Sequence, residues 1–305
     1  MLLVVQTALE LGFLYAPVAL ALFLSFRVLD IADLTTDGCF VLGAAVSVTL
    51  TAAGHPLLAV PAAMLAGACA GFITAFLQTR LSVPSILAGI VTNTGLYTIN
   101  LMAMGWRSNE SLLGSDTVFT LLRSTGLGGD WYELVLAAAV TLLCAGLLAL
   151  FLGTRLGLSI RATGDNPDMV RSSSINPTFT TIVGLCVANA FTGLSGCLLA
   201  QSQKSVSIDI GTGMVTIALA SLLMGQVLLG KGSILKRAIG MVVGAFAFRL
   251  VYTIALRLDM PAFMLKLVSS VIVVLAIATP YFKKQLPMLR RRMAARKEAR
   301  LHAED

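Results

Sequence analysis

Residues 161–177 read Arg-Ala-Thr-Gly-Asp-Asn-Pro-Asp-Met-Val-Arg-Ser-Ser-Ser-Ile-Asn-Pro, a polar stretch between two apolar runs that are each long enough to cross a bilayer. Asn166 can cap the first amide groups of a helix, and Pro167 fits the first helical position. Asp168 lies where the positive end of the helix dipole favours an anion. Pro177 disfavours a helical conformation in the residue before it. The stretch therefore predicts a short helix of about two turns, ~12 Å long. The alternative is an ordinary connector with incidental caps.

The composition outside this stretch indicates a membrane protein. The chain has 305 residues, of which 57% are hydrophobic and only 12% charged, whereas soluble domains carry about 25% charged residues. A transmembrane barrel would show alternating segments of about ten residues instead of long apolar runs. The fold class expected is therefore all-α, a polytopic transmembrane helical bundle. It would form one domain over residues 1–282, followed by a basic tail at 283–305.

Nine apolar runs are candidate spans, and about eight to ten spans are expected in all. They lie near residues 2–25, 38–53, 57–78, 84–104, 133–153, 178–200, 212–229, 238–256 and 262–280. Lys and Arg gather in the 155–177 loop, the 231–237 loop and the tail, which the span count puts on one side. Short basic loops mark the cytoplasmic side of a membrane. The C-terminus is therefore expected in the cytoplasm, and the 105–132 and 203–211 loops outside.

Two places break the pattern of long spans, at residues 27–38 and 204–213. Each is a polar, Asp- and Gly-containing segment before an unusually short apolar run. Paired breaks in opposite halves are typical of an inverted repeat with discontinuous helices, although two such loops can also arise by chance. The residues expected in the broken-helix loops are Asp33, Thr35, Asp37, Gly38, Asp209, Gly211 and Gly213.

Polar side chains within the spans are candidates for a translocation path. In the fourth span Asn93, Tyr97 and Asn100 recur at helical spacing and share a face, and Asn189 lies in the middle of the sixth. Polar groups at membrane depth are costly and face the protein interior or a path. The alternative for each is a hydrogen bond between helices, which typically contributes ~0.6 kcal/mol.

Several function classes lose support from what the sequence lacks. It has no GxxxxGK[ST] motif for binding a nucleotide by a P-loop. His55 and His302 are its only histidines, and the five cysteines are scattered singly without metal-ligand spacing. No catalytic site, metal site or bound cofactor is expected. The net charge of +7 is concentrated in the tail, which beside a span favours contact with anionic lipid over nucleic acid.

Two segments resemble a known family. Residues 157–176, from Gly-Leu-Ser-Ile-Arg-Ala to Ser-Ile-Asn, resemble the coupling-helix segment of bacterial ABC importer permeases, in the group that contains the branched-chain amino acid and ribose permeases. Ser174 stands where that family often has Gly. Residues 28–44 are similar to the family's early segment, in which a short polar Gly-containing stretch precedes a broken helix. The resemblance covers roughly residues 10–280.

The resemblance implies a transport subunit that has no motor of its own. Two cytosolic ATPase subunits, using ATP and Mg, would each grip a coupling helix, and a second copy of the chain would complete the path. An extracytoplasmic binding protein would deliver the solute. Met169 and Val170 would offer the ATPase an apolar face, in the helix-in-groove mode. The coupling residues expected are Arg161, Gly164, Asp165, Asn166, Pro167, Asp168, Met169, Val170, Arg171 and Asn176.

The resemblance places the protein in the bacterial inner membrane and favours an amino acid, including an aromatic one, as substrate. A sugar or a nucleoside is the alternative substrate. A stand-alone secondary carrier or channel is the alternative function. The capped helix separates the two functions, because a carrier has no use for a docking helix.

Overall fold

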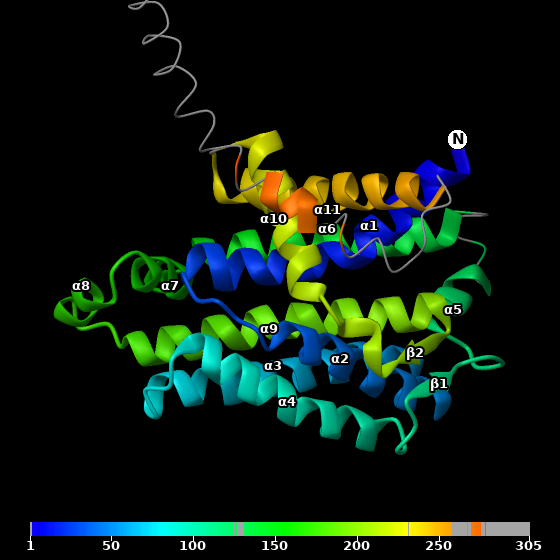
Figure 1. Cartoon of the computed structure of the whole chain (residues 1–305), viewed down its shortest axis with the longest axis horizontal. Coiled ribbons are helices and arrows are strands. Elements are labelled where there is room, and N and C mark those ends of the chain that lie inside the picture. The colour runs from blue at the N-terminus through cyan, green and yellow to red at the C-terminus, as the bar shows by residue number, and fades with distance from the viewer. Residues whose placement is uncertain are drawn as a thin grey trace, which may run out of the picture.

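The structure is a computed structural model that describes residues 2–124, 126, 131–230, 232–257, 267, 270–275 and 278. The helices are α1 (Leu2–Leu22), the π-helix η1 (Phe23–Val28), α2 (Thr36–Ala52), α3 (Pro56–Arg80), α4 (Ser85–Ala103), α5 (Val118–Ser124), α6 (Tyr132–Gly153), α7 (Arg155–Asp165), α8 (Pro167–Ser172), α9 (Pro177–Gln203), the 3-10 helix η3 (Ile208–Gly211), α10 (Met214–Leu229) and α11 (Ile234–Arg257). Two short strands are β1 (Asn109–Ser111) and β2 (Ser205–Ser207). The long helices lie side by side along the long axis of the molecule (Figure 1).

The all-α bundle predicted from the sequence is confirmed. In the described part of the chain, seven helices are long and apolar enough to cross a membrane, and α2 is a shorter apolar helix. These eight correspond to the first eight predicted spans. The ninth predicted span, 262–280, lies mostly outside the described residues, as does the whole of the predicted tail at 283–305.

Helix α9 forms the centre of the bundle and packs most extensively against α3 and α2. Small residues make these contacts close. A Cβ atom added at Gly67 or Gly71 of α3 would meet the carbonyl oxygens of Asn189 and Leu185 on α9. The Gly67–Gly71 spacing therefore brings two backbones together, as small residues do where no hydrophobic force drives helices together in lipid.

Both predicted helix breaks are present, but the first is shorter than predicted, because Asp37 and Gly38 lie in the first turn of α2 and not in the loop. After η1 the chain turns at Asp30, whose φ is 57°, and residues 29–35 run back into the bundle without helical structure before α2 begins (Figure 1). In the second half, β2 and η3 enter from the opposite end before α10 begins. Helix α2 has 17 residues and α10 has 16, so each is about 25 Å long, less than the ~30 Å hydrocarbon core.

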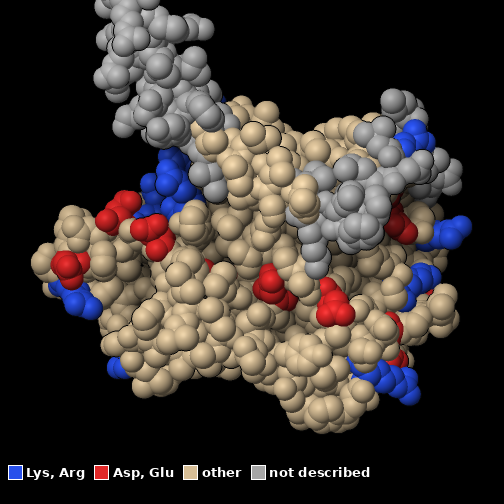
Figure 2. Space-filling model, viewed as in Figure 1, with Lys and Arg blue, Asp and Glu red and all other residues tan. Residues whose placement is uncertain are grey.

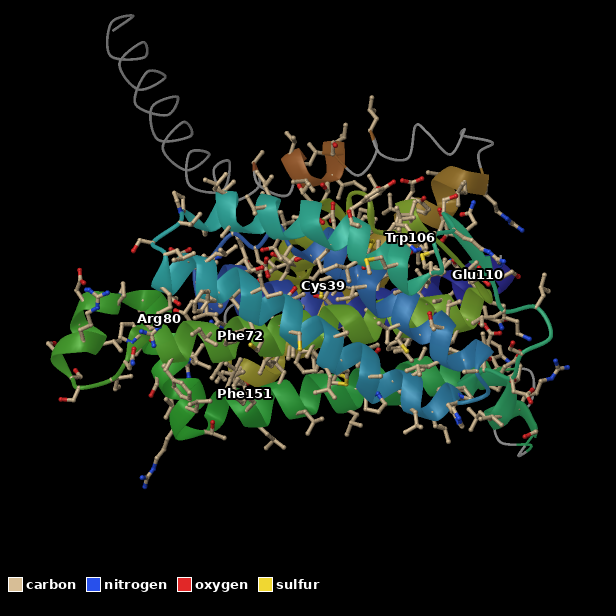
Figure 3. All side chains as sticks on the ribbon, turned by 90° about the horizontal axis from the view of Figure 1, so that it is seen from below. Cys39, Phe72, Arg80, Trp106, Glu110 and Phe151 are labelled. Atoms are coloured by element: carbon tan, nitrogen blue, oxygen red, sulfur yellow. The ribbon has the colours of Figure 1, made fainter. Side chains whose placement is uncertain are left out.

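The two ends of the bundle differ. Helices α7 and α8 project at one end, and β1, β2 and α5 lie at the other (Figure 1). The strands pair antiparallel, with Glu110 opposite Val206, so the two loops predicted to share the outer face do meet. Trp106 and Glu110 lie at this strand end, and Arg80 lies toward the end with α8 (Figure 3). On the face drawn in Figure 2, Lys and Arg side chains lie toward the two ends of the long axis.

Candidate functional site

The predicted cap at Asn166 is present. Its Oδ1 accepts hydrogen bonds from the backbone N–H groups of Asp168 (3.1 Å) and Met169 (3.0 Å), and Pro167 takes the first position of α8. The helix is shorter than the two turns predicted: it has six residues and ends at Ser172. The chain then passes through Ser174, whose φ of 59° is left-handed and cannot continue a right-handed helix.

The other end of the loop is also capped. Asn176 accepts a hydrogen bond from the N–H of Thr178 (3.0 Å), so it begins α9 rather than ending the short helix. Asn176 thereby fixes where the projecting loop joins the central helix. Arg161, Asp165 and Asp168 are exposed, and Arg171 lies 3.8 Å from Asp168 in a solvent-exposed ion pair.

The surface of α8 corrects one prediction. Met169 is 57% exposed, but Val170 is only 1% exposed. Consecutive residues on a helix point about 100° apart, so Val170 can face the protein while its neighbour Met169 faces outward. Met169 alone of this pair is available to a partner. Val170 holds α8 against the rest of the chain and does not belong to an exposed apolar face.

The preceding helix, α7, was not predicted and connects α8 to the bundle. Thr154 caps its start by accepting from the N–H of Gly157 (3.2 Å). The hydroxyl groups of Thr163 on α7 and Thr180 on α9 lie 2.8 Å apart and share a hydrogen bond. Gly164, predicted as a coupling residue, is a packing position, because a Cβ added there would meet the carbonyl of Val28. The α7–α8 unit therefore rests on the residues that lead into the first helix break.

Asn189 does not line a path. It is 1% exposed, and its Nδ2 donates to the carboxylate Oδ2 of the equally buried Asp33 at 2.7 Å. Asp33 Oδ1 accepts from the N–H of Thr35 at 2.9 Å, and the Thr35 hydroxyl lies 2.7 Å from that of Thr74. The first helix break is thus held in place by buried hydrogen bonds that satisfy a costly charge. Asn189 therefore bonds within the protein, as its alternative interpretation supposed, but its partner lies in the non-helical segment before α2 and not in another helix.

The two helix breaks meet at Asp37. Its Oδ2 accepts the N–H of Gly213 at 3.1 Å, and its Oδ1 accepts the N–H of Val215 at 2.9 Å. A carboxylate at the first turn of α10 satisfies N–H groups that have no partner within the helix, and it is favoured by the helix dipole. Gly213 itself has a φ of 85°, a conformation that glycine adopts without strain. Asp37 at the start of α2 therefore caps α10.

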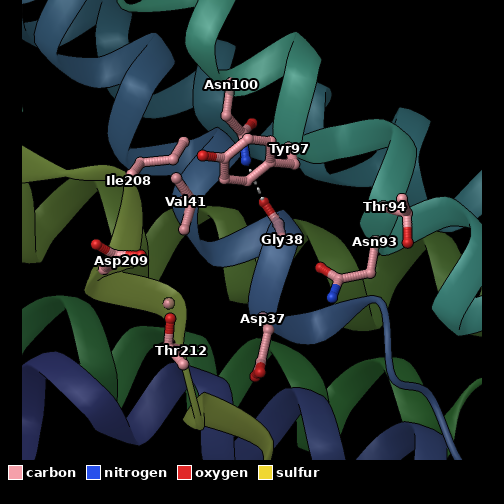
Figure 4. Close-up of a pocket in the computed structure, with 11 residues that line it drawn as sticks. Asp37, Gly38, Val41, Asn93, Thr94, Tyr97, Asn100, Ile208, Asp209 and Thr212 are labelled. Atoms are coloured by element: carbon pink, nitrogen blue, oxygen red, sulfur yellow. Dashed lines mark hydrogen bonds between the residues drawn. The ribbon is translucent and has the colours of Figure 1, made fainter. Parts of the chain in front are cut away.

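A polar pocket of about 360 Å³ lies beside this junction (Figure 4). Its lining combines the predicted face of the fourth span with both breaks: Asp37, Gly38, Val41, Asn93, Thr94, Tyr97, Asn100, Ile208, Asp209, Gly211 and Thr212. Figure 4 shows Asp209 and Thr212 across the pocket from Asn93. Asn100 donates from Nδ2 to the Gly38 carbonyl at 3.0 Å. The sequence singled out most of these residues in separate segments, but Val41, Thr94, Ile208 and Thr212 were not among the named candidates. It carried no signal that the segments would meet.

A first prediction concerns the Asp37 cap. Asp37→Ala should speed hydrogen exchange at the amides of Gly213 and Val215 by roughly 10- to 100-fold, because each hydrogen bond to a charged group contributes about 1.5–3 kcal/mol. Exchange followed by mass spectrometry on the purified chain in detergent would measure this. Asp209→Ala is the matched control, since no hydrogen bond to the Asp209 carboxylate is present among the described residues. Equal exchange in both variants would contradict the assigned cap.

The fold and the pocket together define a polytopic helical membrane permease, with two broken helices and a polar pocket where they meet. The chain belongs to the family described as the permease component of the branched-chain amino acid transport system, which it matches over residues 4–277.

Individual relatives agree with this assignment. The chain is 32% identical over 262 residues to the tyrosine transport system permease protein of Clostridioides difficile, covering 86% of each chain. It is 28% identical to an uncharacterised protein of Rickettsia prowazekii, covering 90% of this chain and 96% of that one. It is 30% identical to the autoinducer 2 import system permease protein LsrC of Salmonella paratyphi B, covering 75% of this chain and 63% of the relative. No solved structure matches the chain.

Proposed function

We propose that the chain is the membrane subunit of an ATP-driven importer that translocates an amino acid, tyrosine or a close analogue, across the bacterial inner membrane. The observation that carries the proposal is a capped, projecting helix at one end of a bundle whose broken helices enclose a polar pocket. The motor is a pair of separate cytosolic ATPase subunits, which supply ATP and Mg chemistry that this chain does not perform. The α8 end and the C-terminus then face the cytoplasm.

The contacts of the α7–α8 unit support its role as a lever. Gly164 of α7 packs closely against the carbonyl of Val28, because a Cβ added at Gly164 would meet that oxygen. The next residue, Leu29, packs in the same way against Gly184 of α9. A pull on Met169 is therefore transmitted to Val28 and Leu29. From there it passes through the buried Asp33 to Asp37 and the pocket. Coupling between a motor and a path can be carried by packed side chains and hydrogen bonds of this kind.

An exposed polar face of α4, beside the pocket, supports a second copy of the chain as partner. Thr94, Tyr97 and Thr98 on α4 are exposed, although they lie within a helix long enough to span the bilayer. Polar side chains at that depth are costly against lipid and face protein or water. A second copy that covers this face of α4 would enclose the path between the two subunits.

The strand end supports the binding protein as the third partner. A second pocket of about 520 Å³ is lined by both strands and by Asp209, which also lines the polar pocket beside Asp37. The pocket beside Asp37 is called the inner pocket below, and the one at the strands is called the outer pocket. A solute released by an extracytoplasmic receptor over this end would pass Asp209 on its way inward. The name of the C. difficile relative favours tyrosine, whereas that of the Salmonella relative favours autoinducer 2. The acidic pocket and the broader coverage support the amino acid.

The experiment that tests the importer against a stand-alone carrier is uptake into proteoliposomes. Wild-type permease reconstituted with its ATPase subunits and binding protein should accumulate labelled tyrosine only when ATP is enclosed on the ATPase side. The permease alone should accumulate none. Tyrosine uptake by the permease alone, driven by an ion gradient and indifferent to ATP, would establish the carrier instead.

A further inference from the structure

Both pockets at the outer half of the molecule carry acidic residues and no basic ones. Asp37 and Asp209 line the inner pocket, and Glu110 and Asp209 line the outer one; among the described lining residues of either there is no Lys or Arg. In the outer pocket Glu110 is paired at its exposed rim with Arg107, at 3.4 Å. A cleft lined by charges of one sign concentrates ligands of the opposite sign. The pockets therefore favour a cationic group.

The two carboxylates of the inner pocket have different tasks. Both oxygens of Asp37 accept backbone N–H groups of α10, so this carboxylate serves the fold. Asp209 is exposed, and within the described part of the chain its carboxylate has no hydrogen-bond or ion-pair partner. Because Asp209 also lines both pockets, a solute that moves between them passes a free negative charge.

Asn100 also lines the pocket, but it does not add a second open acceptor. Asn100 is 1% exposed, and its Nδ2 donates to the carbonyl of Gly38. Because a carbonyl only accepts, the orientation of this amide is determined and Oδ1 must face the other way. In the described structure that oxygen is buried without a hydrogen-bond partner, as costly a state for an acceptor as for a donor. Protein atoms cover this oxygen, so the acceptor that stays open to a solute in the pocket is the Asp209 carboxylate.

We propose that the inner pocket recognises the primary ammonium group of its substrate, with the exposed and unpaired carboxylate of Asp209 as the counter-charge. An ammonium group offers three donors and no acceptor, which complements a carboxylate that only accepts. The Thr212 hydroxyl and the Asn93 amide, on opposite sides of the pocket (Figure 4), can donate to the carboxylate of an amino acid. This inference rests on the proposed function and deepens it, because it excludes neutral sugars.

The charge preference of the pocket can be tested without knowing the substrate. Thr212→Cys places a thiol in the pocket, in a chain whose exposed Cys69 and half-buried Cys186 are replaced by serine. The thiol would be reacted with a cationic and an anionic methanethiosulfonate of similar size, in membranes. Relative to the same ratio for a free thiol in solution, the cationic reagent should be preferred about tenfold. Asp209→Asn should bring the preference to within about twofold of the free thiol.

The matched control for charge removal is Asp116→Asn, at an exposed carboxylate of the strand end that lines neither pocket. It should leave the tenfold preference intact. Asp209→Glu should also preserve it, because the charge remains. An anionic or absent preference in the Thr212→Cys chain, or a preference that Asp116→Asn removes as completely as Asp209→Asn, would overturn the assignment.

Tyrosine uptake by the complete importer is the second measurement. Asp209→Asn should lower it about tenfold, and Asp209→Glu should restore most of it. If wild-type importer carries tyrosine and Asp209→Asn carries it equally well, the ammonium site is wrong while the proposed function stands. If the charge preference is present but wild-type importer carries no tyrosine, the site stands and the proposed substrate is wrong.

Discussion

Replacing Met169 with aspartate is expected to abolish ATP-driven uptake while the bundle stays folded. The Met169 side chain is 57% exposed on α8. Met169 contributes its backbone N–H to the Asn166 cap, so the substitution leaves that hydrogen bond in place. If the side chain enters an apolar groove of the ATPase, an unpaired carboxylate there would cost about 3 kcal/mol, a factor of roughly 100 in docking. Uptake should fall by a similar factor.

The measurement pairs tyrosine uptake with retention of the ATPase subunit during purification of the permease from membranes. Leu113→Asp is the matched control: it makes the same kind of change at an 85% exposed residue of the opposite end, and it should leave ATPase retention unchanged. Val170→Asp is unsuitable, because it would place a charge at a buried position and damage the fold. Met169→Asp protein that keeps its ATPase and transports normally would rule out α8 as the docking helix.

Gly196→Ala is expected to have the largest effect on stability. In the middle of α9, a Cβ atom at residue 196 would collide with the carbonyl oxygen of Phe40 on α2 and would approach the backbone nitrogen of Ala44 to 3.1 Å. Backbone atoms cannot move aside as a flexible side chain does, so the helices must separate. Overpacking of this kind costs about 1–3 kcal/mol, occasionally more, out of a total of about 5–15 kcal/mol.

Gly146→Ala in α6 is the control, and its expected change in stability has the opposite sign, since nothing lies within 4 Å of a Cβ added there. Alanine is favoured over glycine inside a helix by about 1 kcal/mol, so this variant should be slightly more stable than wild type. The thermal unfolding midpoint in detergent, with the yield of monodisperse protein, would measure both. Similar midpoints for the two variants would contradict the close α2–α9 contact.

The loop at residues 161–177 shows which structural features can be predicted from residues close together in the sequence. The Asn166 cap and the Pro167 start were predictable because capping depends on neighbours within three residues. The length of the helix was not predictable, because the left-handed conformation of Ser174 ends it early. Nor was the burial of Val170, because the side of α8 that faces the protein depends on α7, and the mixed composition of α7 does not form an apolar run.

The pocket shows that contacts between segments far apart in the sequence could not be predicted. Helical spacing correctly placed Asn93, Tyr97 and Asn100 on one face. Asn189 was assigned to a path on the same reasoning, yet its partner is Asp33, 156 residues away. Polarity within a span indicates that a side chain needs a partner. It does not indicate whether that partner is a solute or another helix.

What this sequence determined by itself is the first eight spans, the two places where helices break and the capped helix between the fifth and sixth predicted spans. Each depends on length, hydrophobicity or capping, which act between residues close together in the chain. Only the tertiary structure decided that Asp37 meets Gly213, 176 residues away, and that Asp209 is left free beside them. The physical reason is that a carboxylate is satisfied by whichever N–H groups the packed helices bring to it, and that choice is made by the close approach of distant backbones.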